Sequence, residues 1–322
     1  MRKLLSYFDL QMFANPNTQT TGTETLSAEN KTYYSKYLIK YAKPALVHDQ
    51  FGQKHPIPKN GGKTIEFRKF SPLPKLTVPL QEGVTPDGQS LDVSTITSTV
   101  KQYGGYVTYS DMLDMTAIDN VALEATEMIG NQAGVSLDTI TRDVLNGGTN
   151  VIFAGGASSR EALTENSKLT VADIKKAVLV LKQQNAPKID GSYVAIIHPN
   201  VASDLTDDPE WKAPHQYVDT ENIYAGEIGR IHGVRFVETT EAKIFEGGVF
   251  STLVLGKNAY GVTGIEGGGL EHIMKQLGSG GTSDPLNQRA TIGWKGTKTA
   301  VRLVETYMVR IESKASTSGT AN

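Results

Sequence analysis

The segment over residues 61–110 constrains the fold of this chain most, because it is extended but poor in apolar side chains. A strand is predicted over 63–70, and four prolines follow it within residues 72–86, which excludes both a helix and a central strand there. A second extended run covers 91–109, where six of the ten residues from Ser90 to Thr99 are Ser or Thr. An isolated hairpin is marginal in water. The sequence therefore predicts a long two-stranded arm that lies on the rest of the chain or on a neighbouring copy.

A long amphipathic helix is predicted over residues 117–146. Apolar residues recur there at helical spacing, and such a helix would be about 45 Å long at 1.5 Å per residue. Thr116 and Asp119 resemble a capping box at its start, and Gly147-Gly148 marks its end. Gly130 and Gly134 inside the helix indicate either a bend or close packing against a neighbour.

The remaining pattern mixes helices and strands, which places the chain in the α+β class. A second helix is predicted from Val171 to about Gln184, capped by Thr170 and Asp173 and followed by Pro187. The other expected elements are a polar arm at 14–32, strands at 193–197, 234–238 and 253–255, a short helix from Pro199, a helical turn at 221–228, a glycine-rich loop at 264–281 and a final strand at 299–312.

Composition and charge exclude several functional classes. The net charge is −2 and no basic run occurs, so a protein that grips nucleic acid tightly through phosphates is not expected. The chain has no cysteine, which excludes disulfides, thiolate metal sites and thiol nucleophiles. No stretch of 18 apolar residues occurs, so no membrane span is expected.

A search for chemistry gives no catalytic, cofactor-binding or metal-binding residue. Gly61-Gly62-Lys63-Thr64 resembles the end of a phosphate-binding loop, but Ile57 stands where the pattern needs glycine. The six histidines lack the spacing of a helical zinc site, and His198 is expected to cap a helix. The other features are each better explained as structural: the acidic cluster Asp204, Asp207, Asp208 and Glu210, the pair Ser158-Ser159, and the two tryptophans Trp211 and Trp294. We therefore expect a protein that is not an enzyme.

Three stretches resemble the major capsid proteins of tailed bacteriophages, especially the branch typified by phage N-four. They are Leu10-Gln11-Met12-Phe13-Ala14, the segment GEIGRIHGVRFVE at 226–238, and the segment DPLNQRATIGWK at 284–295. The third stretch is the most specific of the three. The order of elements from about 33 to 313 is also similar to that of the Hong Kong 97-type coat fold.

This resemblance implies a role for each part of the chain. Residues 1–50 would form an N-terminal arm, 51–110 an extended loop over a neighbouring subunit, 111–190 a peripheral domain with the spine helix 117–146, 191–294 an axial domain, and 295–322 the strand that completes the peripheral domain, with a C-terminal tail. The copies would assemble as pentamers and hexamers in a virion capsid, inside the host bacterial cytoplasm. The expected partners are a scaffolding protein, a portal protein, decoration proteins and loosely contacted double-stranded DNA, with no membrane and no cofactor.

Three alternatives remain open from the sequence. An encapsulin-type bacterial compartment shell would share the coat fold, and gene context would separate it from a phage coat. A cytoplasmic enzyme with an unrecognised site would show a polar cluster in one pocket. A receptor-binding or carbohydrate-binding virion protein would form trimers in place of pentamers and hexamers.

Overall fold

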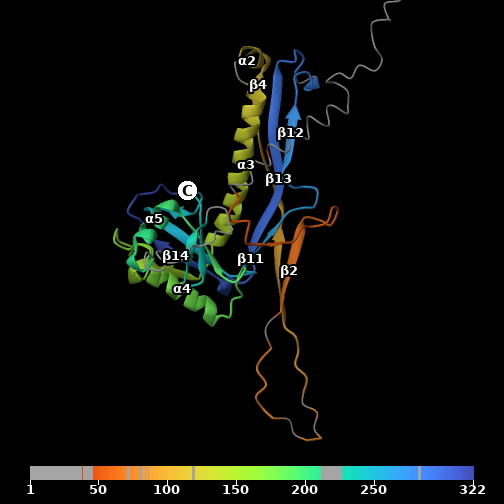
Figure 1. The fold of residues 1–322 in the computed structure, drawn as a ribbon. Helices are drawn as coiled ribbons and strands as arrows, with labels where there is room; N and C mark the ends of the chain where they lie inside the picture. The colour runs from red at the N-terminus through yellow and green to blue at the C-terminus, as the bar shows by residue number, and fades with distance from the viewer. Residues whose placement is uncertain are drawn as a thin grey trace, which may run out of the picture.

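The fold consists of a long helix beside a long sheet, a compact part built on a second sheet, and a hairpin that projects away from both (Figure 1). The computed structural model describes residue 38 and residues 46–70, 73–79, 82–83, 85, 87–117, 120–211, 227–281 and 284–322. Within these residues the strands form sheets of five, seven and two strands.

The long sheet is organised around β13 (Arg289–Arg302), which is 14 residues long. One edge of β13 pairs antiparallel with all ten residues of β4 (Lys101–Ser110). Antiparallel partners are also supplied by β11 (Tyr260–Thr263) and β12 (Glu271–Lys275), while β1 (Gln53–Lys54) pairs with β11. The segment over 289–298 was not predicted as a strand, and the expected loop at 264–281 is wrong where β12 forms.

The predicted spine helix is α3 (Val121–Asn146), which packs on one face of this sheet. Side chains alternate along β13, so Ala290, Ile292 and Trp294 meet α3 while their neighbours face the other way. The shared core contains Leu38, Tyr109, Ala122, Ile129, Ala133, Leu137, Ala290, Ile292 and Trp294.

The predicted start of this helix, at 117, is wrong. Asn120 is the N-cap, because its side chain accepts a hydrogen bond from the Leu123 amide, and a separate helix α2 (Asp111–Thr116) precedes it with Ser110 as its cap. Asp119 of the expected capping box lies outside the described residues. Gly130 and Gly134 lie on the buried face of α3, which favours close packing as the reason for glycine there.

The compact part is a sheet in the order β5, β14, β10, β6, β8, β7, with β9 added beside β10. These strands are β5 (Val151–Phe153), β6 (Tyr193–Ile197), β7 (Glu227–Ile231), β8 (Val234–Glu238), β9 (Ile244–Phe245), β10 (Val249–Leu255) and β14 (Met308–Ser313). One face packs on α4 (Val171–Gln183) and α5 (Pro199–Asp207), and the other packs on the end of α3 and on β11. The compact part is thus joined to the long sheet through a continuous apolar core.

Several predictions for the compact part are confirmed, and one is wrong. Thr170 caps α4, and Pro199 is the first residue of α5. The strands β6 and β8 have the predicted bounds. The single strand expected over 299–312 is divided: β13 ends at Arg302, the 3-10 turn η5 (Glu305–Tyr307) follows, and β14 enters the compact sheet. The helical turn expected at 221–228 lies mostly outside the described residues, and Glu227 and Ile228 belong to β7. A further 3-10 turn, η3 (Ala154–Gly156), follows β5.

The projecting hairpin is formed by β2 (Thr64–Phe70) and β3 (Val93–Thr99), which pair antiparallel over seven residues. The extended run expected over 91–109 is interrupted at the buried residue Val100, where the chain passes from the hairpin into β4. Of the helices in the described ranges, none combines the length and apolar character needed to cross a membrane.

Candidate interaction surfaces

The side chains that the sequence offers as candidates for chemistry make structural contacts. His198 caps α5 by accepting from the Asn200 amide, and its burial lowers the pKa of its imidazole. Asp204 contacts the C-terminal tail, Asp208 accepts from the Val171 amide, and Glu210 pairs with Lys175. Among the described residues, no three His, Asp or Glu side chains are grouped as a metal site would require.

The two tryptophans pack in cores, as predicted. Trp211 meets Phe236 edge to face with ring centroids 5.1 Å apart. Trp294 donates from its indole nitrogen to Gln132 of α3 at 3.2 Å. Lys63 and Thr64 lead into β2 and not into a helix, which removes the phosphate-loop interpretation.

The hairpin is a surface that the described part of the chain leaves uncovered. Large apolar side chains are exposed in the segment between its two strands, with Leu76 and Val78 each at 82%. Leu73, Leu91 and Val93 are exposed as well. Burying an exposed aliphatic side chain of this size is worth roughly 1.5–3 kcal/mol, so the hairpin is suited to a partner that covers it.

The base of the hairpin is fixed to the long sheet. Phe67 of β2 lies so close to Gly261 of β11 that a Cβ there would approach the Phe67 ring to 3.0 Å. Ser98 and Thr299 share a hydrogen bond of 2.8 Å between β3 and β13. The direction in which the hairpin leaves the body is therefore set by packing at its base.

A buried polar network joins the segment before β1 to α3. His48 donates its backbone amide to Asp138 Oδ1 at 2.8 Å, and its Nδ1 lies 2.6 Å from Asp138 Oδ2. Both side chains are almost fully buried. The hydroxyl of Tyr260 donates to the backbone carbonyl of His48, and burial raises the pKa of that hydroxyl well above its usual value.

The network continues into the long sheet through Lys298. Its Nζ donates to Asp49 Oδ2 at 2.5 Å and to the Leu137 carbonyl at 2.6 Å. Thr141 of α3 donates to the other oxygen of Asp49 at 2.6 Å. Burial lowers the pKa of Lys298, and the charges of Asp49 and Asp138 oppose that effect. These bonds join the 46–51 segment, α3 and β13 to one another.

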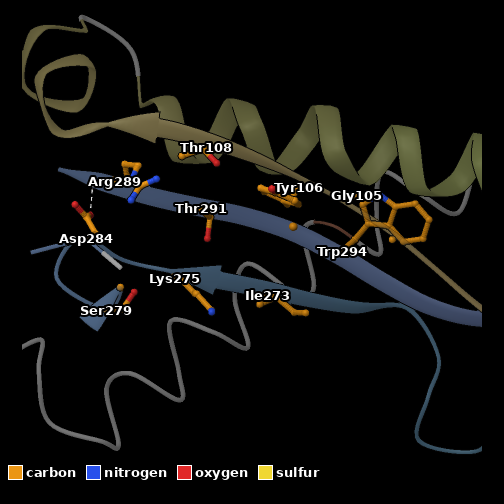
Figure 2. A pocket seen from close by; sticks show the side chains of 13 residues that line it. Gly105, Tyr106, Thr108, Ile273, Lys275, Ser279, Asp284, Arg289, Thr291 and Trp294 are labelled. Carbon is orange, nitrogen blue, oxygen red and sulfur yellow. Dashed lines mark hydrogen bonds between the residues drawn. The ribbon is translucent and has the colours of Figure 1, made fainter. Parts of the chain in front are cut away.

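A shallow cavity of about 600 Å³ lies on the face of the long sheet opposite α3 (Figure 2). Its floor is flat where Gly293 carries no side chain, because a Cβ on Gly293 would lie 2.9 Å from the Gly105 carbonyl oxygen and 2.9 Å from the Tyr106 Cβ. Tyr106, which is 76% exposed, stands over this floor, and Lys275 and Arg289 lie along its rim.

Sequence reasoning missed both the cavity and the network. His48 and Asp138 are separated by 90 residues, and Asp49 and Lys298 by 249, so no local spacing marks either pair. The cavity is lined by side chains from three strands, β4, β12 and β13, and their register follows from pairing that the sequence does not display.

Comparison with known proteins identifies the class to which this architecture belongs. A family model described as "Phage capsid protein" matches residues 93–311, which is more than half of the chain. The chain therefore belongs to the phage capsid protein family. No curated protein sequence matches the chain significantly.

Solved phage shells show the same fold at low sequence identity. The capsid of Ralstonia phage GP4 is 14% identical, with 85% of this chain and 89% of that chain covered and a TM-score of 0.65. The capsid of Cyanophage P-SCSP1u is 13% identical, with coverages of 84% and 89% and a TM-score of 0.64. The expected α+β, Hong Kong 97-type coat fold is thus confirmed. An encapsulin complex from Synechococcus elongatus is also similar, at 10% identity, coverages of 85% and 89% and a TM-score of 0.53.

Proposed function

We propose that copies of this capsid protein associate as pentamers and hexamers into the icosahedral shell that encloses the double-stranded DNA genome of a tailed bacteriophage. The observation that carries the proposal is the family match over 93–311, together with a hairpin whose apolar side chains are exposed. In a monomer the exposed apolar side chains of this hairpin would stay in water, whereas a neighbouring copy would bury them.

We assign parts of the chain to the domains of the coat fold as a further proposal. Residues 1–50 would be the arm and 51–110 the extended loop, with the β2–β3 hairpin as its projecting part. Residues 111–190 would be the peripheral domain, 191–294 the axial domain, and 295–322 the closing segment. We change this assignment for two elements. Helix α4, within 111–190, and strand β14, within 295–322, both pack in the core of the compact part, so we place them with the axial domain.

The proposed partners follow from the shell. The net charge of −2 suits a wall that contacts packaged DNA loosely, since a strongly basic inner face would hold the DNA during packaging. A scaffolding protein, a portal protein and decoration proteins are further proposed partners, with assembly in the host cytoplasm. Because the family is structural, we infer that the chain has no catalytic site.

Negative-stain electron microscopy of the purified protein at high concentration, with and without its candidate scaffold, tests the proposal. We expect closed shells, or rings of five and six subunits. A variant that lacks residues 72–90 is the matched comparison, because the described residues of this segment are exposed and their loss leaves the cores intact. This variant should fold normally but assemble poorly. A uniform small oligomer of the full-length chain under every condition would contradict the proposal.

The encapsulin alternative retains one supporting observation, the structural similarity to the encapsulin complex. Its TM-score of 0.53 is below the 0.65 of the Ralstonia phage capsid, and the family model is that of a phage capsid protein. Neighbouring genes for a portal and a terminase would exclude a compartment shell, and a cargo enzyme gene beside this one would favour it.

A further inference from the structure

Helix α2 has no buried residue, although half of its six residues are large and apolar. Met112, Leu113 and Met115 are 62%, 47% and 69% exposed. A helix of six residues is too short to be stable in water on its own, so packing must supply its stability. Unbranched methionine side chains adapt readily to an irregular partner surface. The apolar face of α2 is therefore suited to a second protein surface.

Helix α2 and the first turns of α3 are acidic. Asp111 and Asp114 lie on α2, and Glu124 and Glu127 lie on the exposed part of the first turns of α3. No lysine or arginine occurs over 111–117 or 120–141. A surface that binds here should therefore combine an apolar floor with positive charge.

The cavity of Figure 2 has these properties. Ile273 and Tyr106 supply its apolar part, and the exposed side chains of Lys275 and Arg289 line its rim. Thr291 lies between them on β13 (Figure 2). The one carboxylate among the described residues of the lining, Asp284, is buried and accepts hydrogen bonds from the Gln288 and Arg289 amides.

The cavity and α2 lie on opposite faces of the long sheet, so they cannot meet within one chain. Tyr109 and Met274 point to the α3 face and line a second pocket with Asp114 of α2, which places α2 on that side. Ile273 and Lys275 alternate with Met274 along β12 and therefore point to the other face. The two complementary surfaces are available only to different copies.

We propose that helix α2 of one copy docks, through Met112 and Met115, into the basic-rimmed cavity of β4, β13 and β12 on a second copy of this chain. This inference rests on the proposed shell function. The contact is heterologous, because two different surfaces meet, and repetition around an axis would close it into a ring. Each copy then gives its helix to one neighbour and receives the helix of another.

Disulfide crosslinking tests the contact directly, because the native chain contains no cysteine. Met115→Cys and Thr108→Cys are prepared as separate variants, one with an affinity tag, mixed before assembly and oxidised. Thr108 is exposed and lines the cavity. Any bond between the two variants joins different copies. We expect a tagged–untagged dimer on a non-reducing gel from assembled shells.

The control replaces Met115→Cys with Leu179→Cys, which is 55% exposed on α4 in the compact part. The inference is overturned if assembled shells give no mixed dimer, or if the Leu179→Cys mixture gives as much. It is also overturned if α2 crosslinks only to an added scaffolding protein.

A second variant measures the contribution of the contact. Met112→Gln with Met115→Gln should leave the melting temperature unchanged, because neither side chain is buried, and should raise the protein concentration needed for shells at least about tenfold. Unchanged assembly would overturn the inference while leaving the shell function intact. Failure of the unaltered chain to form shells would instead contradict the proposed function.

Discussion

Replacing Lys298 by methionine should destabilise the subunit strongly. The substitution keeps an unbranched apolar side chain but removes the ammonium group, whose Nζ bonds Asp49 and the Leu137 carbonyl. The Lys298 side chain is 6% exposed and that of Asp49 is 17% exposed. Asp49 would keep its bond from Thr141 but lose the cation that balances its charge. Leaving one member of a buried pair uncompensated costs about 3–5 kcal/mol, and the partial exposure of Asp49 favours about 3 kcal/mol.

This loss is measurable by thermal unfolding of unassembled subunits. At about 2–4 °C for each kcal/mol in a large domain, the melting temperature of Lys298→Met should fall by about 6–12 °C. Lys295→Met is the matched control on the same strand, since Lys295 pairs with Glu271 at 3.0 Å with both side chains about half exposed. An exposed pair contributes at most about 1 kcal/mol, so the control should lose no more than about 4 °C.

A second substitution separates charge from packing. Asp49→Asn added to Lys298→Met removes the uncompensated carboxylate, so the double variant should regain part of the lost melting temperature. Equal melting temperatures for Lys298→Met and Lys295→Met would refute the argument that the buried network holds the body together. A double variant that melts lower than Lys298→Met would show that lost packing, and not lost charge balance, causes the effect.

Two further predictions concern other parts of the fold. Gly293→Ala should cost about 1–3 kcal/mol by chemical denaturation, because its Cβ would lie 2.9 Å from the Gly105 carbonyl oxygen. Gly296→Ala should cost little, because its Cβ would come no nearer than 3.8 Å, to the Leu270 Cα. Burial of Asp204 opposes its ionisation, but hydrogen bonds from Ser316 together with the charge and hydrogen bond of Lys168 outweigh that effect and lower the pKa of its carboxyl group. The resulting stabilisation is present above the unfolded-state pKa and lost as the pH falls through the folded-state pKa. Asp204→Asn should therefore be less stable by about 1–2 kcal/mol at neutral pH, with the difference closing below about pH 4 in unfolding curves.

Elements with a regular apolar pattern could be predicted from the sequence. The α4 helix and the β6 and β8 strands have the predicted positions because their periodicity and caps are local signals. The predicted start of α3 is wrong because apolar spacing in the sequence begins before Asn120, and only the hydrogen bond that the Asn120 side chain accepts from the Leu123 amide shows where the helix begins.

The first ten residues of β13, RATIGWKGTK, were missed for the opposite reason. Three glycine or alanine residues and two threonines leave only Ile292 and Trp294 as large apolar side chains, which is too weak a pattern to predict a strand. Pairing with β4 along one edge and β12 along the other stabilises this segment. Tertiary context therefore overrides local preference at the strand that organises the long sheet.

Some charged side chains of this subunit are buried and some apolar side chains are exposed, and both features serve assembly. Asp138 and Lys298 are buried, while Leu76 and Met115 are exposed. A buried ion pair adds little net stability compared with an apolar substitute, but its directional bonds fix the elements that share it. The 46–51 segment, α3 and β13 are fixed in this way, so the hairpin and α2 project from a rigid frame. Rigid presentation lowers the entropy lost on association, which lets weak apolar contacts between copies add up to a stable shell.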